Sequence, residues 1–516
     1  MLQSRGQRVA VVVLAVVAAL ALLAGCGGGD SSSSSSSSSG DGGAESTGSG
    51  WPGLDSSNTR FVEGSITRDT APSLKVAWKL PLTAESTFGA YAATPVVVNG
   101  VIYSQDLESD VQAIDLESGE VLWTTKFESL DQGPNGVTVQ NGSVFGATAS
   151  EAFALDQETG EKLWSTPLVG ANGEGIDMAP GYHEGLVYVS TVPTNANAEY
   201  PEGGVGILWA LDAETGKKVW HFNTVPNSLW GNKKVNGGGG LWYAPSFDDQ
   251  GSMYFGTGNP SPFPGTPQFP WGSSRPGPNL YTNSMVKLDA KTGKLQWFYQ
   301  QTPHDLFDWD FQDPPILTSA GGRELAIGAG KSGIVVALDA KTGKPVWKTP
   351  VGEHNGHDED GLKAMKGQKL PAKMLVAPGS LGGVIAPMAA NKTTVFVPVV
   401  NHPVEYAGNG ERSENSPLTG EMVALDIKTG KEEWSEEYET AAFGAPVAVN
   451  DMVFFTTFEG TVHGLDATTG GEVWSESLPA GSNTAVTADG DTLLVPAGIA
   501  VAEGQKPTLV AYRLSE

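Results

Sequence analysis

Three segments of this sequence carry oxygen-bearing side chains of the kinds that bind hard cations and move protons. Asn259 lies in a Gly-Asn-Pro turn, Asp308 ends the polar run 299–308, and Glu202 precedes two glycines. Carboxylate and amide oxygens are the ligands that Ca²⁺ prefers, and a bound cation can polarise a carbonyl group. A nearby carboxylate can take the proton of a substrate hydroxyl. These residue types suit a cation site beside a general base if folding brings them together.

Two further residues have side chains that could contact a ligand. Trp242 follows the glycine run 237–240, and Lys331 lies in a Gly-Lys-Ser-Gly segment. An indole ring offers an apolar surface on which a planar ring can stack. Each candidate also has a structural alternative: a tryptophan after glycines can plug a central channel, Asp308 can cap a turn, and Asn259 can occupy a left-handed turn position.

Histidines offer weaker candidates. His304 is expected to be a structural hydrogen-bonding residue in its loop. The acidic, glycine-containing stretch 354–360 holds two histidines and is the alternative place for a metal, although such loops are usually solvated.

Charge and cysteine content exclude several classes of protein. The chain has 31 Lys plus Arg against 58 Asp plus Glu, which gives a formal net charge of −27. This charge repels phosphate backbones and argues against a nucleic-acid partner. A single cysteine, Cys26, cannot form an internal disulfide, a Cys-based zinc site or an iron–sulfur site.

One phrase recurs along the chain: an apolar stretch, an Asp, a Thr-Gly or Ser-Gly shortly after it, and then a Trp. We expect each copy to form a β-hairpin in which the Asp accepts turn amides, the Gly adopts a positive φ, and the Trp lies on the return strand. These tryptophans should pack one unit against the next. The copies contain Trp123, Trp164, Trp220, Trp297, Trp347, Trp434 and Trp474.

The repeats predict the fold. Another pair of strands precedes most copies, so each unit has four strands. The segment 74–78 supplies a Trp strand without a hairpin partner, and 508–514 supplies the partner without a Trp. We therefore predict an all-β, eight-bladed β-propeller of four-stranded antiparallel blades, closed by its N- and C-terminal strands. Longer intervals between tryptophans mark insertions, which we expect to shape a site on one face.

The repeat resembles that of the quinoprotein dehydrogenases, eight-bladed propellers that bind pyrroloquinoline quinone (PQQ), from about Trp51 to the carboxyl terminus. The opening segment 55–61 is similar to their Asn-Thr-Arg entry segment. The segments 255–262, 275–282 and 299–308 match alcohol-oxidising members of the family in order and nearly in spacing.

The resemblance implies roles for the candidate residues. Asn259 and Glu202 would be calcium ligands, and Asp308 would be the general base at the calcium ion. Trp242 would stack on the cofactor and Lys331 would contact a quinone oxygen. The implied cofactors are PQQ and calcium, and the implied substrate is a small alcohol or a similar molecule. No Cys-x-x-Cys-His motif is present, so electrons would leave to a separate acceptor.

The sequence also departs from the family. The stretch 130–136 lacks the adjacent cysteine pair that the family places there and the Arg that follows it, and 89–95 lacks a Glu that contacts the cofactor. A second function therefore stays open, in which the propeller is a non-catalytic scaffold for protein binding or envelope assembly.

The amino terminus has the features of an export signal. Two arginines precede an apolar run at 9–23, and Leu-Ala-Gly-Cys at 23–26 resembles the lipobox of bacterial lipoproteins. We expect residues 1–25 to be a lipoprotein signal peptide, Cys26 to be acylated, and the Ser/Gly-rich stretch 26–50 to be a flexible tether. Residues 51–516 would form the propeller, anchored by lipid to a membrane on its extracytoplasmic side.

Overall fold

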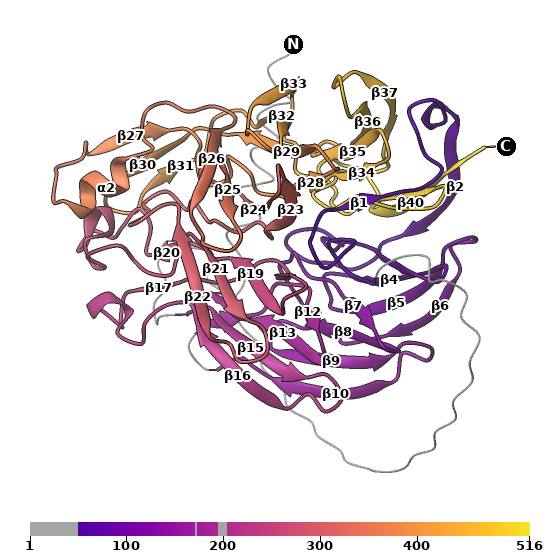
Figure 1. Ribbon diagram of the computed structural model, residues 1–516, viewed down its shortest axis with the longest axis horizontal. Helices are drawn as coiled ribbons and strands as arrows, with labels where there is room; N and C mark the ends of the chain where they lie inside the picture. The colour runs from indigo at the N-terminus through magenta and orange to yellow at the C-terminus, as the bar shows by residue number, and fades with distance from the viewer. Residues whose placement is uncertain (1–49, 171–172, 194–203, 516) are drawn as a thin grey trace.

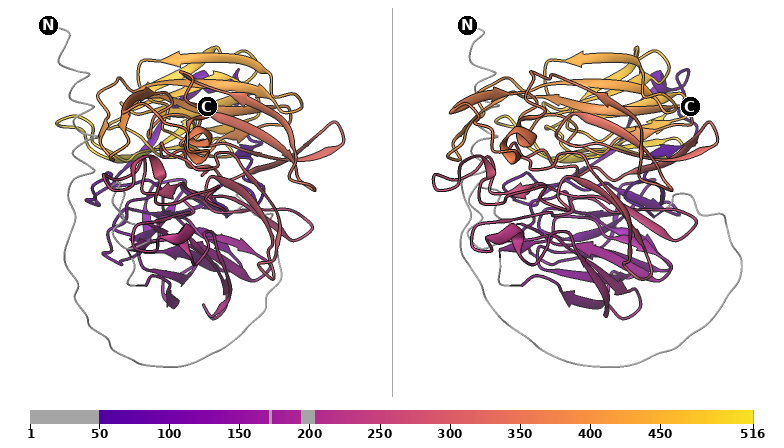
Figure 2. Two further views of the ribbon diagram at one scale, coloured as in Figure 1. Left: turned by 90° about the vertical axis from the view of Figure 1, so that its left-hand side faces the viewer. Right: turned by 60° about the vertical axis from the view of Figure 1, so that its left-hand side comes forward.

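The computed structural model describes residues 50–170, 173–193 and 204–515, and over these ranges the chain forms eight blades of four antiparallel strands around a ring, and β1 (Phe61–Val62) extends one of them as a fifth strand (Figure 1). This confirms the predicted eight-bladed β-propeller. The side views in Figure 2 place the first and last halves of the chain on opposite sides of the ring.

The first four blades along the chain each use four consecutive main strands. They comprise β3 (Val96–Val98), β4 (Val101–Gln105), β5 (Val111–Asp115) and β6 (Val121–Thr125); β7 (Thr138–Gln140), β8 (Ser143–Ala147), β9 (Glu151–Asp156) and β10 (Lys162–Pro167); β12 (Gly181–His183), β13 (Leu186–Ser190), β15 (Ile207–Asp212) and β16 (Lys218–Asn223); and β18 (Ser246–Phe247), β19 (Ser252–Gly256), β21 (Ser284–Asp289) and β22 (Leu295–Gln300).

The remaining blades include the one that closes the ring, where β2 pairs with β40 as predicted. They comprise β23 (Ile316–Ala320), β24 (Arg323–Gly328), β25 (Ile334–Asp339) and β26 (Pro345–Pro350); β28 (Ala389–Ala390), β29 (Thr394–Asn401), β32 (Thr419–Asp426) and β33 (Glu432–Tyr438); β34 (Val447–Val449), β35 (Met452–Thr457), β36 (Thr461–Asp466) and β37 (Glu472–Ser477); and β38 (Thr487–Asp489), β39 (Thr492–Ala497), β40 (Thr508–Leu514) and β2 (Leu74–Pro81).

The recurring Asp, Gly and Trp join neighbouring blades, as the repeat predicted. In the second blade the Asp156 carboxylate accepts the Thr159 amide at 2.9 Å, and Gly160 has a φ of 72°. A Cβ atom at Gly160 would lie 2.6 Å from the Trp123 ring of the preceding blade. Glycine is therefore required by both backbone conformation and space. The Trp123 indole also donates to the Gln157 carbonyl at 3.3 Å.

Trp220 departs from this pattern. Trp164 donates to the Ala213 carbonyl of the next blade at 2.9 Å, but the buried Trp220 indole nitrogen has no hydrogen-bond partner within the described ranges. The corresponding carbonyl, that of Ala290, accepts the Tyr188 hydroxyl at 3.0 Å. Trp220 therefore contributes packing without the hydrogen bond that Trp164 makes.

The entry segment crosses the ring and connects blades that are distant in sequence. The carbonyls of Ser56, Ser57 and Thr59 accept amides from the fourth, fifth and sixth blades, and β1 (Phe61–Val62) pairs in parallel with β34. The fully buried Arg60 donates to the carbonyls of Pro52, Pro446 and Val486. These bonds fix the inner ends of the blades relative to one another.

Short elements in the insertions lie outside the blades. They are β11 (Glu174–Gly175) paired with β14 (Val192–Pro193), β17 (Gly237–Gly238) paired with β20 (Pro260–Ser261), and a sheet of β27 (Lys373–Val376), β30 (Val404–Ala407) and β31 (Arg412–Ser413), with the helices η1 (Ala71–Ser73), η2 (Leu229–Gly231), η3 (Pro270–Gly272) and α2 (Asp360–Met365). In the part of the chain that the structure describes, no helix is long and apolar enough to span a membrane.

Candidate functional site

The loop after β22 holds Asp308 in a constrained conformation. Asp308 has a φ of 67°, which is unusual for a residue with a side chain. Before it, the buried Asp305 carboxylate accepts the Phe307 and Trp309 amides, both at 2.8 Å. Phe307 and Trp309 are themselves buried. The loop thus anchors its aromatic residues and presents Asp308 between them.

Lys331 joins Asp308 to a second carboxylate. Its ammonium nitrogen lies 3.0 Å from Asp308 Oδ2 and 2.7 Å from Asp310 Oδ2. Asp310 also accepts the backbone N–H of Asn259 through Oδ1. The structure therefore brings three of the predicted residues, Asn259, Asp308 and Lys331, into one network through Asp310.

Asp310 is a residue that our sequence reasoning missed. The available signal was its spacing in Asp308-Trp309-Asp310, because alternate residues of an extended segment project to the same side.

Burial and charge act against each other in this network. Burial raises the pKa of Asp308, while Lys331 and Arg412 pull that pKa down and Asp310 pushes it up. Burial would lower the pKa of Lys331, but Asp308 and Asp310 raise it above its ordinary value. The lysine is therefore held as an ammonium ion, and it compensates the two acids beside it.

Trp242 lies close to this network and to the ring axis. A Cβ atom at Gly258 would meet Asp310 Oδ1 at 3.0 Å and the Trp242 indole nitrogen at 3.3 Å. Trp242 and Tyr243 line a cavity whose other walls come from blades around the ring, including Asn135, Ala179 and Asn483. The indole is therefore placed between the axial cavity and the Asn259 segment.

The remaining candidates, Glu202 and the histidines, do not join this network in the described residues. Glu202 lies outside the described residues. The buried His304 ring contacts the Gly277 carbonyl through Nδ1 at 3.1 Å, and burial lowers its pKa to about 4, so the ring is neutral near pH 7 and fits the structural role.

The alternative metal site at 354–360 is not formed in the structure. His354 and His357 contact different carboxylates, those of Asp358 and Asp360. Within residues 50–170, 173–193 and 204–515, no three His, Cys, Asp or Glu side chains form a metal-binding group.

A second acid pair lies in the loops that contribute Asn135 and Ala179 to the wall of the axial cavity. Asp131 and Asp177 contact each other through their buried side chains, and one oxygen of each has no hydrogen-bond donor among the described residues. Burial raises the pKa of both, and the charge of Asp131 raises that of Asp177 further. A proton shared between the two carboxyl groups satisfies both oxygens. Asp131 lies in the stretch that lacks the expected cysteine pair.

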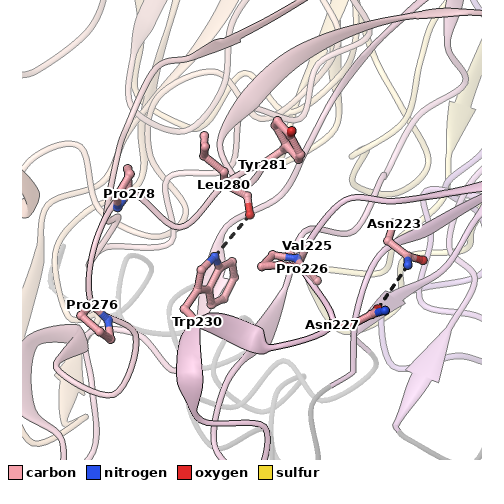
Figure 3. Close-up of a pocket in the computed structure, with 9 residues that line it drawn as sticks. All are labelled: Asn223, Val225, Pro226, Asn227, Trp230, Pro276, Pro278, Leu280 and Tyr281. Atoms are coloured by element: carbon pink, nitrogen blue, oxygen red, sulfur yellow. Dashed lines mark hydrogen bonds between the residues drawn. The ribbon is translucent and has the colours of Figure 1, made fainter. Parts of the chain in front are cut away.

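A wider pocket of about 540 Å³ lies outside the network (Figure 3). Tyr281, which lines this pocket, is linked to the Asn259 segment, because the Thr257 hydroxyl donates to the Tyr281 carbonyl at 2.6 Å. The Trp230 indole donates to the Leu280 carbonyl at 3.3 Å, which fixes the ring at the pocket wall. None of our candidate residues lines this pocket. The lining residues are Asn223, Val225, Pro226, Asn227, Trp230, Pro276, Pro278, Leu280 and Tyr281.

The donor set fits a hard cation beside a planar quinone. Asp308 and Asp310 supply carboxylate oxygens, which suit such a cation, and Asn259, whose backbone N–H bonds to Asp310, carries an amide oxygen on the adjoining segment. Lys331 supplies an ammonium group for an electronegative oxygen, and Trp242 supplies an aromatic face.

Two family models match the chain in different regions. The β-propeller domain of glucose, ethanol and alcohol dehydrogenases, a PQQ-repeat model, matches residues 175–382. The model of the outer membrane protein assembly factor BamB matches residues 73–166, 107–236 and 416–515. The fold and these matches define a PQQ-repeat β-propeller.

Individual relatives give a more specific classification than the family models. The quinohemoprotein alcohol dehydrogenase of Comamonas testosteroni is 31% identical over 86% of this chain and 71% of the relative. Its crystal structure matches with a TM-score of 0.77 and 26% identity, covering 90% of this chain and 80% of that chain. This chain therefore belongs to the quinoprotein alcohol dehydrogenase family.

Other matches are more distant or cover less of the relative. The quinone-type alcohol dehydrogenase subunit of Gluconobacter oxydans is 28% identical over 66% of this chain, and this chain spans about half, 51%, of that subunit. A europium-containing methanol dehydrogenase has a TM-score of 0.76 at 19% identity, covering 91% of this chain and 98% of that chain, which shows the shared fold.

Proposed function

We propose that this protein oxidises alcohols, using PQQ and a hard cation held beside Asp308. The observation that carries the proposal is the network in which Lys331 and Asp310 tie Asp308 to the Asn259 segment beside Trp242. The relatives named above are alcohol dehydrogenases, and their quinone dependence supports the same chemistry here.

The chain's own residues would act on the substrate hydroxyl. Asp308 would accept its proton, because a carboxylate whose pKa is raised by burial is a stronger base than an exposed one. Asn259 and the carboxylates would hold the cation, which we propose to be calcium. Trp242 would orient the cofactor and Lys331 would contact one of its oxygens. Bound PQQ supplies a two-electron acceptor for the hydride of the carbinol carbon.

Calorimetry combined with dye-linked oxidation tests this function. We expect the purified protein to bind PQQ with calcium and to oxidise a short alcohol when a dye accepts the electrons. Europium is a useful second cation, because the second carboxylate, Asp310, favours a higher charge and a methanol dehydrogenase of the same fold contains it. If neither cation gives PQQ binding or turnover with alcohols, aldehydes or sugars, the enzyme proposal is wrong.

A non-catalytic scaffold is the second candidate. The match of residues 73–166 and 416–515 to the BamB model, together with the acid pair in place of the cysteine stretch, favours it. Partners would then be envelope proteins. Capture of an envelope protein by the cation-free, PQQ-free chain, together with no turnover, would support this reading.

We also propose that the protein is exported and anchored to a membrane by lipid on Cys26, with a separate electron acceptor on the extracytoplasmic side. The support is the sequence of residues 1–50, most of which lie outside the described residues. Mass spectrometry of the mature amino terminus should find an acylated cysteine after removal of residues 1–25. A Cys26→Ala variant should not partition with membranes, and retention there would refute the anchor.

A further inference from the structure

An inserted cap covers the Asp308 loop. We define the cap as β27, β30, β31 and α2, which Figure 1 shows beside β17 and β20 at the edge of the ring. Its Tyr406 hydroxyl donates to the Phe307 carbonyl at 2.9 Å, one residue before Asp308. Met374 and Val404 of the cap belong to the same buried apolar cluster as Phe307. The cap therefore packs directly on the segment that carries the candidate base.

Arg412 lies on the face of the cap that is turned toward this loop. Arg412 and Tyr406 are register partners on β31 and β30. Directly paired residues of adjacent strands project to the same face of a sheet. Since Tyr406 bonds to the Asp308 loop, Arg412 faces the loop as well. The charge of Arg412 accordingly acts on both Asp308 and Tyr406.

The guanidinium of Arg412 also contacts the Asn259 segment. Its central carbon lies 5.0 Å from the ring centroid of Phe263, which is four residues after Asn259 and is buried. Stacking on a ring fixes the plane of a guanidinium and leaves its N–H groups free to bind at the edge. Arg412 thus stands between the two segments that carry Asn259 and Asp308.

Arg412 has no polar partner in the part of the chain that the structure describes. The other five arginines in this part all have one: Arg60 and Arg275 donate to carbonyls, and Arg68, Arg323 and Arg513 pair with carboxylates. Arg412 makes no such hydrogen bond or ion pair, although the protein carries 58 acidic residues. It is also only partly exposed, as are the side chains of Asp308 and Lys331, at 16% and 12%. A partly exposed, unpaired guanidinium at this place is suited to bind an anion.

We propose that Arg412 binds a carboxylate of the substrate, so that the preferred alcohols are hydroxy acids. This rests on the proposed function. The carbinol carbon gives a hydride to the quinone and its hydroxyl gives a proton to Asp308, so the alcohol becomes a carbonyl and the quinone takes up two electrons. The carboxylate itself is unchanged in the reaction and serves only to position the carbinol.

Matched substrates test this assignment. We would compare 3-hydroxypropanoate, 4-hydroxybutanoate and 5-hydroxypentanoate with 1-alcohols of the same carbon number, in the wild type and in Arg412→Met, Arg412→Lys and Arg323→Met. The ratio of kcat/KM for the best acid to that for its alcohol should fall about 10- to 100-fold in Arg412→Met, the usual value of a charge-assisted bond. Taking the ratio cancels any effect that the arginine has on Asp308.

The controls separate charge from folding. Arg412→Lys keeps the charge, so its ratio should fall less than that of Arg412→Met. Arg323→Met removes an exposed arginine of the fifth blade and should keep the ratio of the wild type. An unchanged ratio in Arg412→Met would overturn the assignment even if alcohols are oxidised. If no alcohol is oxidised, the proposed function fails, and calorimetric titration with the hydroxy acid decides on Arg412: weaker binding in Arg412→Met supports it, and equal binding refutes it.

Discussion

Two pairs of aspartates near the axial cavity differ in how their charge is compensated. Asp308 and Asp310 share the ammonium group of Lys331, which lies within 3.0 Å of both. Asp131 and Asp177 have no Lys, Arg or His among the groups that act on their pKa within the described residues, and they face each other directly. The first pair therefore has a cation that offsets its charge, although burial still raises the pKa of Asp308 to about 8. The second pair has no such cation and must hold a proton between its members.

The family models do not separate the two pairs. Asp308, Asp310 and Lys331 lie within residues 175–382, the region that matches the dehydrogenase model, and so does Asp177, whereas Asp131 lies only within the region that matches the BamB model. Carboxylates whose charge is offset by an ammonium group are suited to bind a metal ion in its place. A pair that shares a proton is suited to donate a hydrogen bond or to hold two loops together. The two pairs therefore suit different roles.

The largest effect should come from Asp308→Asn. The amide cannot accept a proton from the substrate, so turnover with PQQ and calcium should fall by about 10³-fold, as is common when a general base is lost. Binding of PQQ, measured by calorimetry, should stay close to that of the wild type, since Trp242 and Lys331 remain. Loss of both binding and turnover would make Asp308 a structural residue.

Lys331→Met should remove the positive charge that offsets the carboxylates of Asp308 and Asp310. Two carboxylates would stay buried without their cation, which typically costs about 3–5 kcal/mol in the free energy of unfolding. Urea denaturation at pH 7 measures this loss. Calcium should restore part of it if Asp308 and Asp310 can bind a cation, because the ion would replace the ammonium charge. A variant as stable as the wild type without calcium would show that the pair is not ionised.

The repeat architecture could be read from the sequence because each contact that defines it is local or periodic. Asp156, Gly160 and Trp123 recur at fixed spacing, and the structure confirms the turn, the positive φ and the packing between blades. The exception at Trp220 could not be foreseen, since its motif has the same residue types as that of Trp164 and only the structure shows its indole nitrogen without a partner among the described residues.

The candidate site was predicted only in part. Motifs identified Asn259, Asp308 and Lys331, and the structure brings them together. Asp310 and Arg412 were missed, because their importance depends on contacts between segments that lie far apart in sequence: Asp310 with Asn259, and Arg412 with Phe263. The acid pair was missed for the same reason, since Asp131 and Asp177 belong to different blades and neither is part of a repeat.

The same substitution in the two pairs should have opposite effects. The folded pKa of Asp177 is raised above its ordinary value, so its contribution to stability is complete below about pH 4 and is lost as the pH rises toward the folded pKa. Asp106, whose pKa burial raises to about 7, adds a loss in the window from about pH 4 to 7. Asp177→Asn removes one acid and supplies an N–H donor to Asp131. At pH 8 it should therefore raise the free energy of unfolding by about 1–2 kcal/mol relative to the wild type, and reduce the slope of stability against pH.

Asp310→Asn is the matched control, because it removes the same charge from a pair that already has a cation. It leaves Lys331 with one partner instead of two and should lower the free energy of unfolding at pH 8. Urea denaturation of both variants between pH 5 and 8 measures whether each substitution raises or lowers the free energy of unfolding relative to the wild type. If Asp177→Asn also lowered stability at pH 8, the second pair would not share a proton but would bind a cation, and added calcium should then stabilise the wild type more than Asp177→Asn. In that case both pairs would be offset by positive charge. Asp308 and Asp310 would have the ammonium group of Lys331, and Asp131 and Asp177 would have a bound cation.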